Sequence, residues 1–389
     1  MKRLFYVFIL FLPLLLLSFL LFSFISGILK IRKIDYAKMR SELQMYLGQE
    51  KGGLTALLKD GVMRINYDYY VKEGPYKKPD KEIPFNPLQD ECLIYVFGSS
   101  VVGSKPPLLK DEVIYFPQLL EGLLNSGGSN KFKVYNFAME GFDSFEVKEL
   151  ALKAFGQRKP DIAIYFDIGV GNFENSYYQC IKKKYYFFWN FLLSNPRLPR
   201  FLNIPADQFL REFLEPNLLN LCQKLKLIRI PLEPFLGFNG LILESEKRNI
   251  LDIIRACQAK RIPLVIVMPM GNLEERPYGI YELTDYYYNK GMKEVDPYRR
   301  IDYLVKARDS EIFTFYFGFK KAVYDFLCGL REKGVYLLDL TDKSPYEMFD
   351  FSYDNFYDYG HMKTKTHRIV AEYLYDFLKK NILDKRNVG

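Results

Sequence analysis

The segment CLIYVFGSS runs from Cys92 to Ser100 and joins a short apolar, β-rich stretch to a glycine turn with two serines. A stretch of this length and composition predicts a buried strand. In an α/β fold, the turn after such a strand presents side chains at the carboxyl edge of the sheet, where ligands bind. Ser100 is therefore the first candidate nucleophile and Ser99 the second.

Further apolar stretches of strand length follow and alternate with helix-like, amphipathic ones. This alternation predicts an α/β fold with a five-stranded parallel sheet flanked by helices. The predicted strands are Cys92–Phe97, Lys133–Phe137, Asp161–Phe166, Pro263–Met268 and Val335–Asp339. The predicted helices are Phe116–Leu124, Phe145–Phe155, Glu246–Ala259, Phe315–Lys333 and Thr364–Lys380.

We assign residues 91–385 to one globular domain. Two long stretches, 182–243 and 271–309, interrupt the alternation after the third and fourth strands. Loops at these strand ends build substrate sites, so the two insertions are expected to form a lid or wall, unless they serve packing alone. Residues 34–90 are basic, rich in Tyr and crowded with prolines, which predicts a membrane-proximal spacer with one short helix near residues 36–47.

The N-terminal segment is the most apolar of the chain. No charged residue occurs from Leu4 to Leu29, and as a helix this stretch would measure about 39 Å, more than the hydrocarbon core of about 30 Å. We therefore expect residues 1–33 to be a transmembrane anchor or uncleaved signal, with a cleaved signal peptide as the alternative. The bulk of this single-pass chain is expected outside the cytoplasm, although the cations at 30, 32 and 33 oppose the positive-inside order.

Composition narrows the class of partner and cofactor. The net charge of +8 is spread along the chain without an Arg-rich arm, which is compatible with anionic membranes or wall polymers and gives no indication of nucleic acid. The five cysteines include no CxxC pair, and Cys92 and Cys257 are expected to be small core residues. Two histidines without a cluster of partner ligands argue against a two-metal site, so we expect neither a metal nor another cofactor.

Only two histidines occur, and the first closes the run Asp358-Tyr-Gly-His361. A carboxylate three residues ahead of an imidazole can turn back onto it, fix its tautomer and stabilise its cation, as a serine-activating base requires. His361 is thus the candidate base and Asp358 its partner. His367 falls within the last predicted helix, where we expect a surface residue.

Four short blocks, in this order, resemble those of the SGNH or GDSL hydrolases, in particular membrane-anchored, bacterial-type members. The blocks are FGSS at 97–100, YNFAMEG at 135–141, IGVGN at 168–172 and DYGH at 358–361. The resemblance implies the fold of that family, a flavodoxin-like three-layer sandwich. It also implies a catalytic triad of Ser100, His361 and Asp358.

The same resemblance implies an oxyanion hole formed by the backbone amides of Ser100 and Gly141 and the side chain of Asn172. Two positions depart from the family pattern: Ser99 stands where the common Gly-Asp-Ser has aspartate, and Asn172 follows Gly169 one residue too late. Asn175 is the alternative to Asn172.

The implied activity is that of a serine esterase or O-acyl hydrolase, or of an O-acyltransferase, acting on an acylated envelope glycan, wall polymer or lipid. A different class stays open: a catalytically inactive, membrane-anchored protein that binds glycan or serves as a scaffold in an envelope-polymer assembly. Each residue also has a structural reading. Ser100 can cap a helix, Asn136 and Gly141 can form a turn, and Asp358 can be one solvated acid among several.

Overall fold

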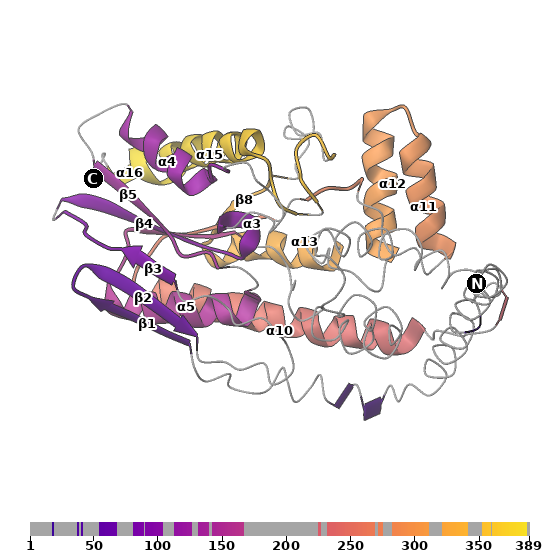
Figure 1. Ribbon diagram of the computed structural model, residues 1–389, viewed down its shortest axis with the longest axis horizontal. Helices are drawn as coiled ribbons and strands as arrows, with labels where there is room; N and C mark the ends of the chain where they lie inside the picture. The colour runs from indigo at the N-terminus through magenta and orange to yellow at the C-terminus, as the bar shows by residue number, and fades with distance from the viewer. Residues whose placement is uncertain are drawn as a thin grey trace, which may run out of the picture.

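The structure is a computed structural model of the 389-residue chain (Figure 1). It describes residues 54–67, 81–88, 90–103, 113–126, 131–139, 142–166, 232–268, 271–274, 282–310, 321–340, 352–358 and 360–386, together with 18, 37–38, 40–41 and 225–226. The predicted membrane anchor and most of the predicted insertion at 182–243 therefore lie outside the described residues. Among the residues that are described, no helix is both long and apolar enough to cross a membrane.

A five-stranded, entirely parallel sheet forms the centre of the domain, in the order β5-β4-β6-β7-β8. Its strands are β4 (Glu91–Phe97), β5 (Lys131–Asn136), β6 (Ile162–Phe166), β7 (Leu264–Val267) and β8 (Tyr336–Leu338). Each overlaps one predicted strand, so the predicted α/β fold with five parallel strands is confirmed. The strand order is the flavodoxin-like one, in which the order reverses between β4 and β6.

Helices cover both faces of this sheet (Figure 1). On one face lie α4 (Phe116–Asn125) and α15 (Thr364–Leu378), and on the other lie α5 (Ser144–Gln157), α10 (Leu232–Ala259) and α13 (Lys321–Gly329). The remaining short helices are α3 (Ser100–Gly103), η3 (Leu330–Lys333), η4 (Lys379–Leu383) and α16 (Asp384–Arg386). The predicted helix 246–259 is the second half of α10, which begins within the predicted insertion.

Side chains of β4 alternate between two hydrophobic cores. Leu93, Tyr95 and Phe97 join the core under α5 and α10, whereas Ile94 and Val96 join the core under α4 and α15. Successive side chains of a strand point to opposite faces, and both faces of a parallel sheet are covered. The strand is therefore apolar from Cys92 to Phe97, which is why it was recognisable from the sequence.

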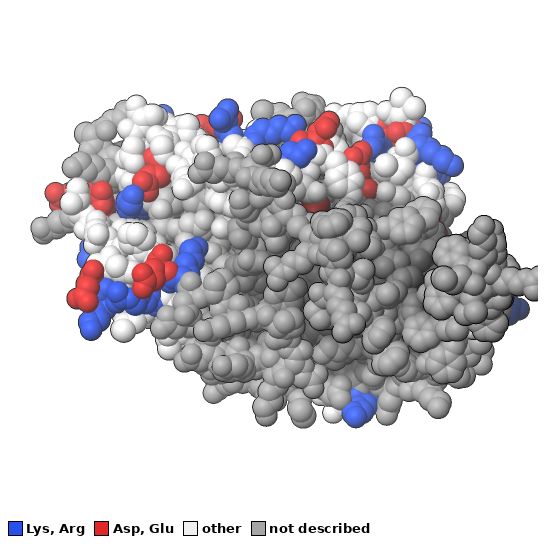
Figure 2. All heavy atoms as spheres, viewed as in Figure 1, with Lys and Arg blue, Asp and Glu red and all other residues white. Residues whose placement is uncertain are grey.

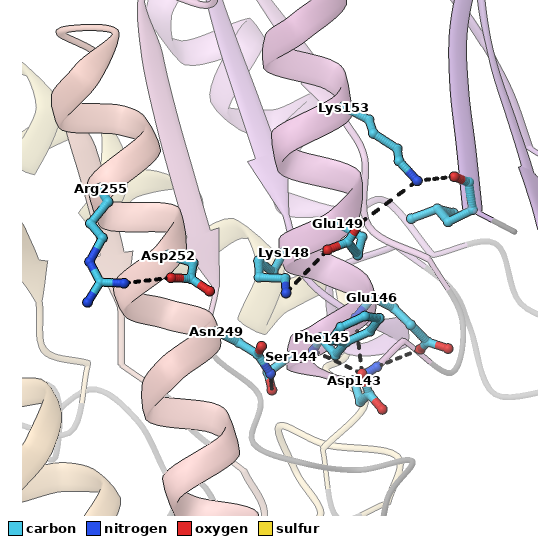
Figure 3. A network of polar contacts seen from close by, with 11 residues as sticks. Asp143, Ser144, Phe145, Glu146, Lys148, Glu149, Lys153, Asn249, Asp252 and Arg255 are labelled. Carbon is cyan, nitrogen blue, oxygen red and sulfur yellow. Dashed lines mark hydrogen bonds and ion pairs between the residues drawn. The ribbon is translucent and has the colours of Figure 1, made fainter. Parts of the chain in front are cut away.

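The start of α5 is fixed by a reciprocal cap (Figure 3). The Asp143 carboxylate accepts hydrogen bonds from the backbone amides of Phe145 and Glu146, at 2.9 and 3.1 Å. In return the Glu146 side chain accepts from the Asp143 amide at 2.9 Å. Asn249 of α10 donates to the Ser144 hydroxyl at 3.0 Å and so ties the two helices of this face together. The helix that follows the second sequence block thus has a defined origin.

Part of the predicted spacer is folded instead. Residues 54–84 contribute an antiparallel sheet of β1 (Leu54–Lys59), β2 (Val62–Tyr67) and β3 (Lys81–Pro84). Met63, Ile65 and Phe85 are buried in the core that also holds α5, and the Phe85 ring stacks on Tyr135 with centroids 4.3 Å apart. The strands are short and carry charged residues on their outer side, which concealed them in a basic, proline-rich sequence.

The predicted insertion at 271–309 contains a pair of helices, α11 (Glu282–Lys293) and α12 (Pro297–Ser310), which lie side by side (Figure 1). Leu304 and Ala307 of α12 are buried, and Leu304 belongs to the core under α4 and α15. Figure 2 shows that the described basic and acidic side chains on one face of the molecule are interspersed.

Candidate active site

The turn after β4 holds the two candidate serines. Ser99 is buried, and its carbonyl accepts a hydrogen bond from the Val102 amide at 3.0 Å. Ser100 is the first residue of α3 and stays partly exposed. Of the two, Ser100 is the one that solvent reaches. It stands at the carboxyl end of β4, beside the reversal of strand order where ligands of such sheets bind.

This turn requires glycine at position 98, because the surrounding atoms leave no room for a side chain. A Cβ atom there would lie 2.6 Å from Cγ2 of Val102 and 3.4 Å from the Phe166 carbonyl oxygen at the end of β6. Val102 is itself fully buried, so its position is set by the core. Glycine therefore lets α3 begin directly over the end of the sheet.

The loop after β5 packs onto the same turn. The amides of Phe137 and Met139 donate to the carbonyls of Val96 and Gly98, at 2.8 and 3.2 Å. Asn136 accepts the Ala138 amide at 3.0 Å through its side chain and thus serves as a turn residue, which is its structural reading. Gly141, Asn172 and Asn175, the candidates for the oxyanion hole, lie outside the described residues.

Asp358 and His361 form a close pair. Nδ1 of His361 lies 2.7 Å from Oδ2 and 3.0 Å from Oδ1 of Asp358. Oδ1 also accepts the backbone amides of Gly360 and His361, at 3.0 and 2.8 Å. Because the carboxylate holds Nδ1, the other ring nitrogen, Nε2, is the one suited to take a proton from a hydroxyl.

The carboxylate is held in its ionised form. Burial raises the pKa of Asp358, but the hydrogen bond and charge of His361 and the two backbone amides outweigh burial, so the net pKa lies below the ordinary value of 3.8. The exposed fractions of the side chains are 32% for Asp358 and 13% for His361. An imidazole that gains a proton here would be stabilised by a fixed negative charge.

A small hairpin presents this pair. The amide of Tyr357 donates to the His361 carbonyl at 2.8 Å, and Lys363 returns its amide to Asn355 at 2.9 Å. The hydroxyl of Thr366, in the first turn of α15, donates to the same Asn355 carbonyl at 2.7 Å. Sequence analysis did not single out Asn355, because an isolated asparagine gives no signal of its role.

The hairpin lies against the turn of the candidate nucleophile. A Cβ atom on Gly360 would be 3.3 Å from Cγ2 of Val101, the residue after Ser100. The structure thus brings the segment between Asp358 and His361 into contact with α3, although the two segments lie far apart in the sequence. The pair of Asp358 and His361 therefore flanks a residue, Gly360, that packs on the helix beginning at Ser100.

The second histidine differs from expectation. His367 is 1% exposed and packs against the rings of Tyr115 and Phe116, with centroids 5.3 and 6.2 Å away. Burial, and to a lesser extent the charge of His361, lowers its pKa to about 3. It lies on the apolar face of α15, so the prediction of a surface histidine was wrong, and we assign it to the core.

No metal-binding cluster of three or more His, Cys, Asp or Glu side chains occurs within the described part of the chain. The cysteine prediction is met in part: Cys257 is buried, whereas Cys92 is only partly buried, at the edge of the core under α4.

The sequence matches no family model and no curated protein. Solved structures that resemble the chain include a lipase/acylhydrolase from Enterococcus faecalis, at 10% identity, 74% coverage of this chain, 95% of that chain and a TM-score of 0.35. A GDSL-like lipase from Bacteroides thetaiotaomicron gives 8% identity, 76% and 92% coverage and a TM-score of 0.37. An acetyl xylan esterase gives 10% identity, 73% coverage of this chain, 98% coverage of that chain and a TM-score of 0.37. At these scores the likeness carries no argument about activity.

Proposed function

We propose that the chain is a serine-dependent enzyme acting on ester bonds, with Ser100 as nucleophile, His361 as general base and Asp358 as the group that orients the base. The observation that carries this proposal is the 2.7 Å contact between His361 and Asp358 in a hairpin packed against the residue after Ser100. A surface histidine needs no carboxylate fixed behind its Nδ1, whereas a serine-activating base does.

The reaction follows from these groups. Nε2 of His361 takes the hydroxyl proton of Ser100 as the serine oxygen attacks the acyl carbonyl, and Asp358 stabilises the imidazolium. The protonated His361 then gives this proton to the departing alcohol, which leaves an acyl-serine. In the second half, His361 activates water or another hydroxyl, which releases the acyl group and restores Ser100.

In the tetrahedral intermediate, the negative charge on the former carbonyl oxygen is stabilised by hydrogen-bond donors. We assign this role to the backbone amides of Ser100 and Gly141 and to the side chain of Asn172, with Asn175 as the alternative. One such donor typically contributes about 100- to 1,000-fold to turnover.

For the substrate we propose an acyl ester of an envelope glycan, wall polymer or lipid. The apolar segment from Leu4 to Leu29 supports this choice, because an anchor would hold the enzyme at a membrane surface outside the cytoplasm. Water as acceptor makes the enzyme an esterase, and a sugar hydroxyl makes it an O-acyltransferase. The competing function is an inactive glycan-binding or scaffold protein, which Ser99 in place of aspartate and the late position of Asn172 favour.

The deciding experiment is labelling of the full chain, purified in detergent micelles, with a fluorophosphonate probe that reacts with base-activated serines. We expect labelling of the wild type and its loss in Ser100→Ala and His361→Ala. Asp358→Asn should slow labelling by about 10,000-fold, because the amide no longer fixes the required tautomer.

Two controls separate the site from the rest of the chain. Ser126→Ala removes a hydroxyl at the far end of α4, and Asp354→Asn removes an exposed acid from the same hairpin region; both should label like the wild type. If the folded wild type does not label, or if Ser100→Ala labels as strongly as the wild type, the result would favour the binding or scaffold protein.

A further inference from the structure

Lys81 reaches from the small sheet to the loop beside the candidate site. Its ammonium group donates to the carbonyl oxygens of Asn136 and Ala138, at 3.0 and 2.6 Å. These two carbonyls belong to the end of β5 and the residues just after it, the segment that leads to Gly141. The lysine thus links the small sheet to the central sheet by hydrogen bonds, in addition to the stacking of Phe85 on Tyr135.

The two carbonyls determine where the neighbouring amides point. In a trans peptide, the C=O and the following N–H point in opposite directions. With the Asn136 carbonyl held by Lys81, the Phe137 amide faces β4 and donates to Val96 at 2.8 Å. With the Ala138 carbonyl held, the Met139 amide donates to Gly98 at 3.2 Å. One ammonium group therefore orients both peptide groups that connect the loop to the serine turn.

Lys81 is itself held in place. It begins β3 and pairs with Ile65 of β2, while Phe85, just after β3, stacks on Tyr135 in β5. The ammonium is largely removed from water, which lowers the pKa of Lys81 to about 8. Dehydration of an ammonium group is costly, and the two carbonyls offset part of that cost. An apolar side chain would fill this place without such a cost, so packing alone does not account for a lysine.

We propose that Lys81 is a positioning residue for the reaction: it aligns the segment 136–139, which ends β5 and follows it, with the turn carrying Ser100. This inference rests on the proposed function, because the alignment affects catalysis only if Ser100 attacks an acyl group. The small sheet thereby becomes part of the catalytic framework.

A second lysine provides the matched control. Lys153, on α5, donates to the Leu54 carbonyl of β1 and so also ties the small sheet to the domain (Figure 3). Lys153 lies in the second half of α5, which leads away from the carboxyl edge of the sheet. Lys81→Met removes two lysine-to-carbonyl hydrogen bonds and Lys153→Met removes one, in both cases between the small sheet and the rest of the domain.

The test compares both variants as full chains in micelles, with a fluorophosphonate probe and a chromogenic acyl ester. We expect Lys81→Met to lower kcat and the labelling rate by about 10- to 100-fold, the size expected for a displacement of about 1 Å at a reacting group, with KM nearly unchanged. Lys153→Met should keep both rates. Equal losses in the two variants, or no loss in Lys81→Met, would overturn the inference.

Hydrogen exchange gives a readout that does not depend on activity. In Lys81→Met the amides of the peptide spanning residues 132–139 should exchange faster, because Phe137 and Met139 lose the constraint that orients them. In Lys153→Met this peptide should be unchanged. If the wild type never reacts with the probe, the proposed function fails, and the exchange rates alone then decide whether Lys81 holds the loop; unchanged exchange overturns that role too.

Discussion

The two histidines of the chain lie close together in the sequence and in opposite electrostatic surroundings. His361 contacts a carboxylate that stabilises its cation, whereas His367 is enclosed by Tyr115 and Phe116, where a cation is disfavoured. The same side chain is therefore suited to proton transfer at one position and to packing at the other. Sequence spacing identified the first through Asp358, but it gave no signal for the burial of the second.

His367 should make the fold sensitive to mild acid. Its pKa is 6.5 in the unfolded chain and about 3 in the folded one, so below pH 6.5 the unfolded state binds a proton that the folded state does not. The free energy of unfolding should fall between pH 6.5 and 3 by up to about 1.4 kcal/mol per pH unit, and stay constant above pH 6.5 as far as this group is concerned. Urea unfolding at pH 7, 6, 5 and 4 measures this slope.

The variant His367→Phe keeps a ring against Tyr115 and Phe116 and cannot take up a proton. Its stability should depend less on pH over the same range. Asp358, whose pKa is lowered from 3.8, adds its own loss as the pH falls below about 5, but this loss is common to the wild type and the variant and cancels in their comparison. Identical slopes for wild type and variant would contradict the assignment of His367.

At the scale of elements, the turn between β4 and α3 depends on the absence of one side chain. In Gly98→Ala the new Cβ meets the buried Val102 at 2.6 Å, and a buried, branched side chain cannot move away without disturbing the core. We expect a loss of about 1–3 kcal/mol in the free energy of unfolding and a labelling rate at Ser100 reduced at least tenfold.

The double variant Gly98→Ala, Val102→Ala tests this explanation, because it removes the Cγ2 atom that the new methyl group meets. The labelling rate should recover in part, even though a cavity remains at position 102. A double variant that labels as slowly as Gly98→Ala would place the fault elsewhere, for example at the Phe166 carbonyl.

Glu274 connects the pair of helices α11 and α12 to the segment just before the hairpin that carries Asp358 and His361. Its carboxylate pairs with Arg300 of α12 and accepts the Tyr353 amide at 3.3 Å, and its carbonyl accepts the Tyr288 hydroxyl at 2.7 Å. In Glu274→Ala the first two contacts are lost, so we expect a loss of about 1–3 kcal/mol in stability and slower labelling of Ser100.

The comparison for Glu274→Ala is Asp302→Ala, which breaks the exposed ion pair with Lys306 on the same helix. An exposed pair contributes little, so this variant should change stability by less than about 1 kcal/mol and leave labelling unchanged. Urea unfolding and the probe assay measure both effects. Similar behaviour of the two variants would show that Glu274 does not connect the hairpin to α12.

At the scale of the whole molecule, the sequence predicted the central sheet well and its surroundings poorly. The strands β4, β6, β7 and β8 are short and largely apolar on both sides, so composition locates them, whereas the edge strand β5 carries Lys133, paired with Glu121. The small sheet was missed because its strands bury only alternate residues, such as Met63 and Ile65, and carry exposed charged residues, such as Arg64, between them. The contact of Asp358 with the His361 ring was predictable from spacing, whereas the role of Lys81 depends on a contact between distant segments.

The predicted anchor leads to a test of orientation. With alkaline phosphatase fused after Gly389, we expect full phosphatase activity in intact bacterial cells, because alkaline phosphatase folds only outside the cytoplasm. Deletion of residues 1–33 from the same fusion should abolish that activity. A green fluorescent protein at the same position should be dark when exported unfolded. Strong fluorescence with an inactive phosphatase would place the domain in the cytoplasm and remove the support for an envelope substrate.

The hairpin that carries Asp358 and His361 lies downstream of all five strands, whereas Ser100 follows the first of them. A ribosome adds roughly 5–20 residues per second, so the serine is synthesised on the order of tens of seconds before the histidine. During this interval the growing polypeptide has a nucleophile without its base. If Ser100 acts as proposed, the order of synthesis keeps the unfinished enzyme from attacking esters that it meets before the domain is complete.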